Sequence, residues 1–498
     1  MRDGAHGALP LPRALRLQTP RGGARLSSPP PLPTPMDSAL QHARDHADRA
    51  VEQLTDWLRI PSISTDPDYA ADTRRAAEWL ADDLRAAGMA RVEVMETGTD
   101  GDRGHPIVYA EHHVSDSAPT VLVYGHYDVQ PPDPLELWDS PPFEPVVVDG
   151  DIVARGSADD KGQAFMHAKA VEAYLQGEGA LPLNVKMMIE GEEESGSVHL
   201  APWIEAHKEL LAADVVLVSD TALFAPGVPS IAYGLRGLAY VEVELTGPSK
   251  DLHSGVYGGG VENPVNALCR MIADLHDADH RVTVDGFYDN VRDLTPEERE
   301  AYAALPFDED AWKAEAGVTH TKTEAGYSTL EGTSGRPTLD VNGMWGGYTG
   351  KGAKTVLPSK ATAKISCRLV PDQTPGEITD KLRAHFEARV PPTMRLDFRD
   401  LHGGHGAIVD TSAPAMQAAA EALEGVFGVR PHFTREGGSI PVVADFKRLL
   451  GLDTVLMGFG LDSDSIHSPN EKFGLDRFHQ GIEASIRFLD AYARQGAA

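Results

Sequence analysis

A histidine and an aspartate two residues apart begin the series of polar side chains that could do chemistry. His126 and Asp128 follow residues 121–124, an apolar run that predicts a short, doubly buried strand of a parallel sheet. Side chains two apart in an extended segment point to the same face. An imidazole can bind a metal through one nitrogen while a carboxylate holds the other. The pair predicts a metal ligand with its supporting acid; an incidental strand-end pair is the alternative.

Other acids and one histidine lie beside further core strands. Taken singly, each has an ordinary explanation, such as an aspartate capping a helix or a solvated acidic run. Together they would meet at the edge where open α/β sheets bind ligands, and the set suits two divalent ions that share a carboxylate. These residues are Asp159 before a helix, Glu193 and Glu194 after an apolar strand, Asp220 after another, and His467 in a late loop.

The composition excludes several other classes of function. A formal net charge of −30 argues against nucleic acid or an anionic membrane as a partner, because both require basic patches. The two cysteines, Cys269 and Cys367, are too few for a disulfide framework or a cysteine-based zinc site. No run of about 18 apolar residues is present, so no membrane-spanning segment is predicted.

The chain of 498 residues is long enough for two packed units. Strands alternate with helices in 37–226 and again in 411–498, which predicts one α/β unit with a mostly parallel sheet. In 227–410 strands flank helices without βαβ repetition, which predicts an inserted α+β unit. The expected helices include 37–58, 72–87 ending at Gly88, 197–212, 263–275 and 375–390, and the expected strands include 119–125, 183–190, 214–219 and 354–369.

Residues 1–36 differ in character from the rest. They are rich in proline and arginine and have no acidic residue after Asp3. This composition predicts a disordered N-terminal extension, with an over-extended start or a transit peptide as the alternatives.

Seven motifs in order along the chain resemble those of the M20 family of metallopeptidases, most closely its dipeptidase branch of the cytosolic carnosine dipeptidase type. They are GHYDVQPP, ARGSADDKG, EGEEESGS, VSD, DLHSGVYGG, REGGSIP and IHSPNEK. One such motif is weak, but seven at fitting spacing are specific. The resemblance implies a catalytic domain of zinc-peptidase type formed by 37–226 and 411–498. It also implies a lid and dimerisation domain at 227–410, a homodimer and a cytoplasmic location.

The resemblance also implies roles for the polar residues at the strand ends. It makes His126, Asp159 and Asp220 the ligands of one divalent ion, and Asp159, Glu194 and His467 those of a second. Zinc is the expected metal, with manganese or cobalt as alternatives. Asp128 would orient His126, and Glu193 would be the general acid and base. Adjacent residues diverge in an extended chain, so Glu194 can bind metal while Glu193 faces the reaction. The Asp159–Asp160 peptide bond is expected to be cis.

The inserted unit carries candidates for substrate binding. His253 matches a family histidine that reaches the active site of the partner subunit, and Arg368 matches an arginine that binds the substrate carboxylate. His402, Thr355 and Ser439 match further substrate contacts. Ordinary explanations are a surface ion pair for Arg368 and a helix cap for Ser439.

The expected reaction is hydrolysis of a dipeptide or short peptide by a metal-bridged water, with Glu193 as general base and His253 assisting at the oxyanion. One alternative is an N-acyl amino acid deacylase or carboxypeptidase-like amidohydrolase, because the same metals can cleave any amide. Another is a non-catalytic dimeric binding protein on the same scaffold. That protein would lack a ligand or the base, and none is missing here.

Overall fold

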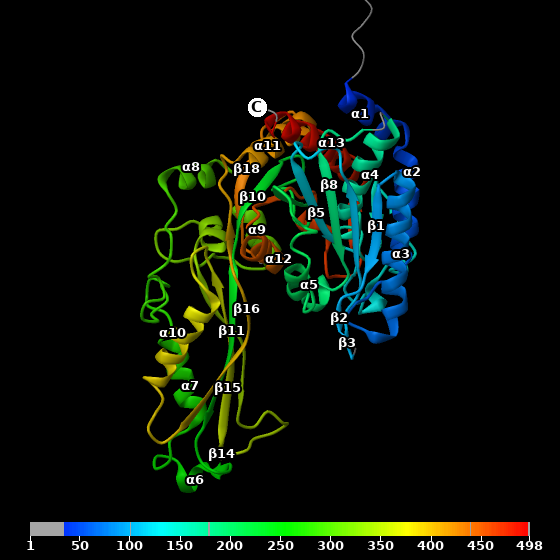
Figure 1. Ribbon diagram of the computed structural model, residues 1–498. Coiled ribbons are helices and arrows are strands. Elements are labelled where there is room, and N and C mark those ends of the chain that lie inside the picture. The colour runs from blue at the N-terminus through cyan, green and yellow to red at the C-terminus, as the bar shows by residue number, and fades with distance from the viewer. Residues whose placement is uncertain (1–33, 100, 178–179, 439, 497–498) are drawn as a thin grey trace, which may run out of the picture.

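The computed structural model describes residues 34–99, 101–177, 180–438 and 440–496, and it has two parts (Figure 1). The larger part is a mixed, mainly parallel sheet covered by helices on both faces, and the smaller is an antiparallel sheet with its own helices. The predicted combination of an α/β unit and an α+β unit is confirmed.

The large sheet has four neighbouring parallel strands at its centre. These are β8, β5, β9 and β19, and their carboxyl ends therefore share one edge. In order across the sheet, the strands are β1 (Arg91–Met95), β4 (Ile107–His112), β8 (Asn184–Glu190), β5 (Thr120–His126), β9 (Val215–Val218), β19 (Thr454–Leu456), β10 (Ser230–Leu235) and β17 (Ala407–Ile408), and β18 (His432–Glu436) pairs with β10.

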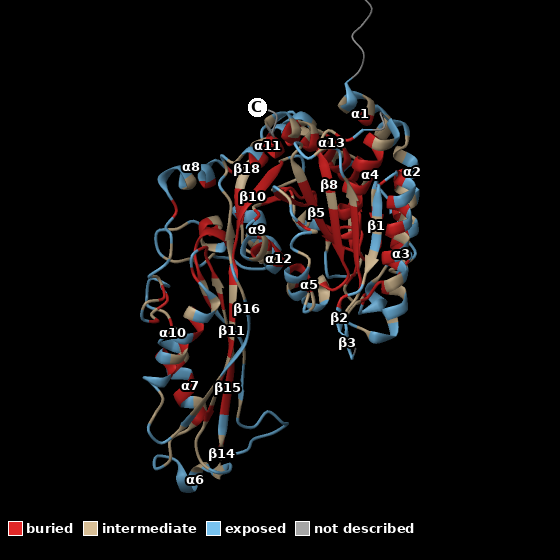
Figure 2. Ribbon diagram, in the orientation of Figure 1, coloured by how far each residue is buried: buried red, intermediate tan, exposed pale blue. Residues whose placement is uncertain are grey.

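Apolar side chains along β5 point alternately to the two faces of the sheet, and both faces are covered. Val121 and Val123 belong to one apolar layer, whereas Leu122 and Tyr124 belong to the other. Both layers are buried (Figure 2), as the apolar run predicted. The first layer contains α1 (Pro35–Asp45), α2 (Ala47–Leu58), α3 (Ala70–Ala87), α4 (Lys161–Gly177), α11 (Pro414–Phe427) and α13 (Leu475–Gly496), and the second contains α5 (Leu200–Ala206) and α12 (Pro441–Asp445).

The smaller part is built on a four-stranded antiparallel sheet. Residues along β11 alternate between buried and partly exposed, as expected for a sheet with one covered face. In order, its strands are β13 (Thr338–Gly346), β15 (Lys360–Leu369), β11 (Gly237–Thr246) and β16 (Arg395–Gly404), and α7 (Pro264–Ala273) and α10 (Pro375–Glu387) complete its core. The far tip is formed by β12 (Leu252–His253), α6 (Ser254–Tyr257) and β14 (Val356–Leu357) (Figure 1).

Smaller elements complete the chain. The large part carries a three-stranded sheet of β20 (Lys472–Gly474), β7 (Asp151–Val153) and β6 (Val146–Val148), and a hairpin of β2 (Gly98–Thr99) and β3 (Asp102–Arg103). Helices α8 (Pro296–Ala304) and α9 (Glu309–Glu315) lie between α7 and β13 in sequence. Among the described residues, no helix is long and apolar enough to cross a membrane.

Several predicted boundaries need correction. The helix expected over 37–58 is two helices, because His46 leaves helical geometry with φ −116° and ψ 17°. The helix expected over 197–212 is only α5. Gly88 does end α3, in the left-handed region with φ 103°. Residues 1–33 of the expected N-terminal extension lie outside the described residues, and Thr34 caps α1.

The limits of the inserted unit stay a prediction. Strands β10 and β17 fall inside the range 227–410, yet both pair within the large sheet. The antiparallel sheet itself lies between them in sequence, so the chain passes from the large sheet into the small one along β10 and β11.

Candidate metal centre

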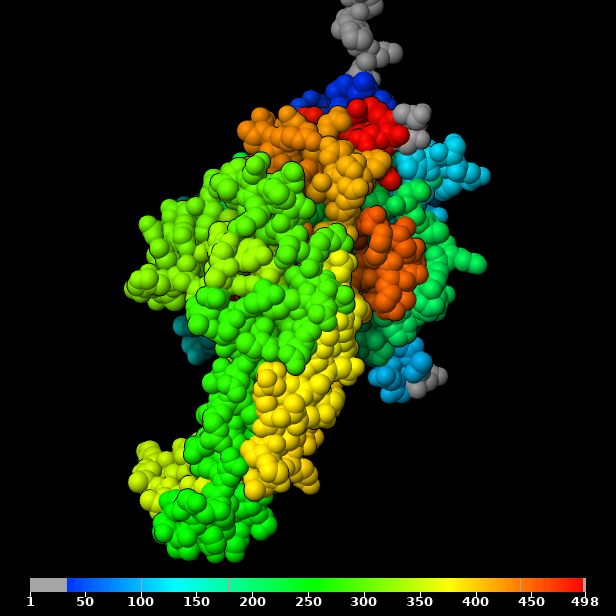
Figure 3. Space-filling view, turned by 90° about the vertical axis from the view of Figure 1, so that its left-hand side faces the viewer, coloured from blue at the N-terminus to red at the C-terminus, as the bar shows by residue number. Residues whose placement is uncertain are grey.

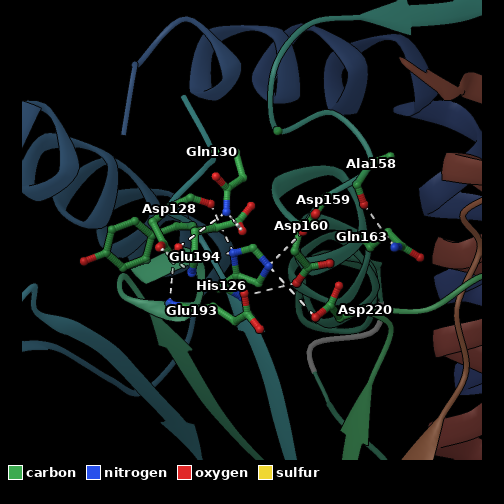
Figure 4. Close-up of polar contacts among 12 residues, drawn as sticks. His126, Asp128, Gln130, Ala158, Asp159, Asp160, Gln163, Glu193, Glu194 and Asp220 are labelled. Atoms are coloured by element: carbon green, nitrogen blue, oxygen red, sulfur yellow. Dashed lines mark hydrogen bonds and ion pairs between the residues drawn. The ribbon is translucent and has the colours of Figure 1, made fainter. Parts of the chain in front are cut away.

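The carboxyl edge of the large sheet gathers polar side chains from five segments, and Figure 4 shows those of this set other than His467. Because β5 and β8 are parallel and in register, His126 lies opposite Glu190, and the turn after Glu190 brings its glutamates beside the imidazole. The residues that meet there are His126 at the end of β5, Asp159 before α4, Glu193 and Glu194 after β8, Asp220 after β9, and His467 after β19.

The first group consists of His126, Asp159 and Asp220. Nε2 of His126 lies 3.0 Å from Oδ1 of Asp159 and 4.0 Å from Oδ2 of Asp220. Nδ1 of His126 donates to the main-chain oxygen of Asp128 at 3.1 Å and lies 3.4 Å from its carboxylate. The proton is thereby held on Nδ1, which leaves the Nε2 lone pair directed at the two acids.

The second group shares Asp159 with the first. Nε2 of His467 lies 2.9 Å from Oδ2 of Asp159 and 3.2 Å from Oε2 of Glu194. Asp159 thus presents one oxygen to each group, as a bridging carboxylate does. Within each group the potential ligand atoms lie within 4.8 Å of one another. The Asp159–Asp160 peptide bond is cis, as expected.

The glutamate turn is held by side chains of the segment after β5. The Asp128 carboxylate accepts hydrogen bonds from the main-chain N–H groups of Glu193 at 3.3 Å and Glu194 at 3.0 Å. The Gln130 amide donates to Oε2 of Glu194 at 2.7 Å (Figure 4). Gln130 was not predicted as a site residue, although its spacing of two from Asp128 places it on the same side of an extended segment.

The electrostatics of this edge suit divalent cations. Burial raises the pKa of the Asp160 carboxyl to about 8 and that of Glu193 to about 7, and nearby carboxylates add to both shifts. Burial together with Asp160 and Asp159 also raises the pKa of Asp220 well above its ordinary value. Nε2 of His126 is buried and no described residue meets it in hydrogen-bonding geometry. Bound cations would relieve the repulsion among these carboxylates and give Nε2 of His126 a partner. These nitrogen and oxygen donors therefore fit zinc or a similar ion.

The substrate-binding candidates of the inserted unit fall into two places. Arg368 pairs with Leu238 near the start of β11, close to the large sheet, and the ring of His402 contacts that of Tyr240. His253 instead pairs with Val356 at the far tip, where the main-chain N–H of Ser254 donates to the main-chain oxygen of Thr355 at 3.1 Å. The narrow end of the unit projects clear of the larger part (Figure 3). Ser439 lies outside the described residues.

Comparison with known proteins gives consistent matches over most of the chain. A Cys-Gly metallodipeptidase of Candida albicans is 32% identical over 461 residues, which cover 89% of this chain and 94% of that protein. The crystal structure of human carnosine dipeptidase 1 superposes with a TM-score of 0.77 at 30% identity, covering 93% of this chain and 99% of that one. A metallo-carboxypeptidase, Sso-CP2 of Sulfolobus solfataricus, gives a TM-score of 0.77 at 33% identity, covering 89% and 99%.

The family-level comparison agrees with these matches. The model of peptidase family M20/M25/M40 matches residues 122–491, a range that includes every residue of both candidate metal-binding groups. The resemblance drawn from the seven motifs is therefore confirmed, and the chain belongs to peptidase family M20/M25/M40.

Proposed function

We propose that this chain is a dinuclear metallopeptidase that hydrolyses dipeptides or short peptides. The observation that carries the proposal is the pair of ligand groups joined through the two oxygens of Asp159, with Glu193 beside them. Similar proteins that bear dipeptidase names support the choice of substrate.

The ligand groups define where two ions would be held. His126, Asp159 and Asp220 would hold one, and Asp159, Glu194 and His467 would hold the other. Zinc suits these donors, and manganese or cobalt can occupy the same set. When bound, such ions polarise a scissile carbonyl and lower the pKa of a nearby water.

Glu193 is the proposed general base. Its main-chain N–H is held by Asp128, while the side chain of the adjacent Glu194 takes part in the second ligand group. Burial raises the pKa of Glu193 to about 7, and bound cations would lower it toward the ionised form that accepts a proton. Glu193 takes the proton from the attacking water and later returns it to the leaving amine.

The separation of the substrate-binding candidates supports a homodimer. Arg368 lies opposite Leu238, whereas Lys360 lies opposite Thr246 at the other end of β11. Eight steps of a strand span about 26 Å, and Thr355 and His253 lie beyond that end. A dipeptide is only about 7 Å long, so one substrate cannot contact Arg368 and His253 of the same chain. His253 and Thr355 would therefore serve the metal centre of a partner subunit.

Subunit complementation is the expected consequence of a histidine that acts across the interface. Inactive Glu193→Gln subunits mixed with inactive His253→Ala subunits should regain about one quarter of wild-type activity, since half of the dimers are mixed and each has one complete site. The measurement is dipeptide hydrolysis after subunit exchange, which is followed with differently tagged chains.

The matched control mixes Glu193→Gln with Glu194→Gln, because both of these side chains belong to the same chain's centre. Without added zinc, that mixture should show no activity beyond that of the separate subunits. Demonstrated exchange without recovery in the first mixture would show that His253 does not act on a partner's site.

A carboxypeptidase-like specificity is the second candidate, favoured by the 33% identity to Sso-CP2. The two candidates differ in substrate length, so the test compares hydrolysis of dipeptides, of longer peptides and of N-acyl amino acids by the zinc-loaded protein. Dipeptides should give the highest kcat/KM. Preferential release of C-terminal residues from longer peptides, or of amino acids from N-acyl substrates, would replace the dipeptidase proposal by the corresponding alternative.

A further inference from the structure

A buried glutamate connects the two segments that supply Asp159 and His467. The Glu471 side chain is fully buried, four residues after His467. Its Oε1 accepts from the main-chain N–H groups of Ala158 at 2.9 Å and Asp159 at 3.2 Å. Its Oε2 accepts from the N–H of Gly156 at 2.9 Å and from the Arg155 guanidinium at 2.7 Å. One carboxylate thus organises the whole turn that leads to the shared ligand.

Arg155 is the charged partner of Glu471 in this contact. Its side chain is 1% exposed, and its second terminal nitrogen donates to the main-chain oxygen of Pro131 at 3.3 Å. The guanidinium lies over the Trp138 ring, 5.5 Å from the centroid. Burying an ion pair costs desolvation and is a poor means of stabilising a fold, so the position of this pair is better explained by what it holds in place.

The loop that bears His467 has little burial of its own to fix it. The His467 side chain is 53% exposed, and Ser465, His467 and Asn470 all have positive φ. The buried Asp464 carboxylate, which binds Arg477, attaches the start of this loop. Glu471 attaches its end, and the main-chain oxygen of Glu471 also accepts from the N–H of Ala154 at 3.0 Å. Glu471 is therefore the residue that links the end of this loop directly to the turn of the shared carboxylate.

We propose that Glu471, supported by Arg155, is a positioning residue for the metal centre: it fixes the turn of Asp159 against the loop of His467, and so sets the spacing between these two ligands. The inference rests on the proposed function for the ligand roles of Asp159 and His467. Glu471 itself contacts neither substrate nor reacting atoms, and acts through the backbone of the turn. Partners that orient metal ligands typically contribute about 10–100-fold to metal affinity.

The test is Glu471→Gln. This change keeps the shape of the side chain but places an NH2 group against the main-chain N–H donors of the turn. Zinc binding to the metal-free protein, measured by calorimetric titration, should weaken by about 10–100-fold. In dipeptide hydrolysis at fixed, limiting zinc, kcat should fall while KM for the dipeptide stays unchanged, and excess zinc should restore part of kcat. Glu471→Asp, which keeps the charge, should fall between Glu471→Gln and the wild type.

Lys169→Met is the matched control, because it also breaks a buried ion pair but lies away from the centre. Lys169 is buried on α4, with Nζ 2.9 Å from the Asp83 carboxylate. It should lower the melting temperature of the metal-free protein and leave zinc affinity unchanged. If Glu471→Gln behaves as this control does, with a lower melting temperature and wild-type zinc affinity, the positioning role is overturned.

A second variant and the wild-type protein distinguish the remaining outcomes. Should Glu471→Gln not fold, Arg155→Lys carries the same test, since it keeps the charge but loses the planar guanidinium that reaches both Glu471 and Pro131. Weaker zinc binding would support the proposal, and wild-type zinc affinity in the folded variant would overturn it. Failure of the proposed function would instead be seen in the wild type, which would bind no zinc or hydrolyse no peptide.

Discussion

Replacing Glu193 by glutamine is expected to lower kcat by at least about 10²-fold while the content of bound metal stays unchanged. Glutamine keeps the size of the side chain but cannot accept the proton of the attacking water. The turn should keep its place, because Asp128 holds it through the main-chain N–H groups of residues 193 and 194. Steady-state kinetics with elemental analysis of the same samples measures both quantities.

Glu194→Gln is the matched control, one residue further along the same turn. Oε2 of Glu194 lies 3.2 Å from Nε2 of His467 and accepts from Gln130, so its loss should weaken metal binding, and added zinc should restore part of the activity. If Glu193→Gln lost metal and Glu194→Gln kept it, the roles of the two glutamates would be exchanged.

The strands that lead to the candidate metal ligands could be predicted from sequence, because they are short apolar runs that are buried in the structure. The apolar runs before His126 and Asp220 correspond to β5 and β9, which are buried on both faces. Parallel strands end at a common edge, so the meeting of their terminal side chains follows from the fold class alone.

The contacts that tie these strands together could not be predicted, because they join residues far apart in sequence. The hydrogen bonds of Glu471 to the turn of Asp159 depend on two loops meeting in space. Likewise, the separation of His253 from Arg368 depends on the register of β11 and β15. Strand β13 was missed altogether, since its mostly exposed, glycine-containing sequence has little apolar alternation.

Removing the metal is the second change expected to have a very large effect on the rate of hydrolysis, and adding the metal back should reverse it. Without ions, the buried carboxylates around Asp159 repel one another and no group polarises the scissile carbonyl, so hydrolysis should fall to background. Because Asp159 faces both groups, Asp159→Ala should abolish tight binding of both ions. Asp220→Ala removes a proposed ligand of one group only and should leave one ion bound.

The most direct measurement titrates zinc into metal-free wild-type protein while hydrolysis of a dipeptide is followed. We expect no activity at the start, recovery as zinc binds, and saturation at about two ions per chain, as the shared carboxylate requires. Undiminished hydrolysis in the presence of a chelator, with no ion bound, would contradict the proposed metal-dependent reaction.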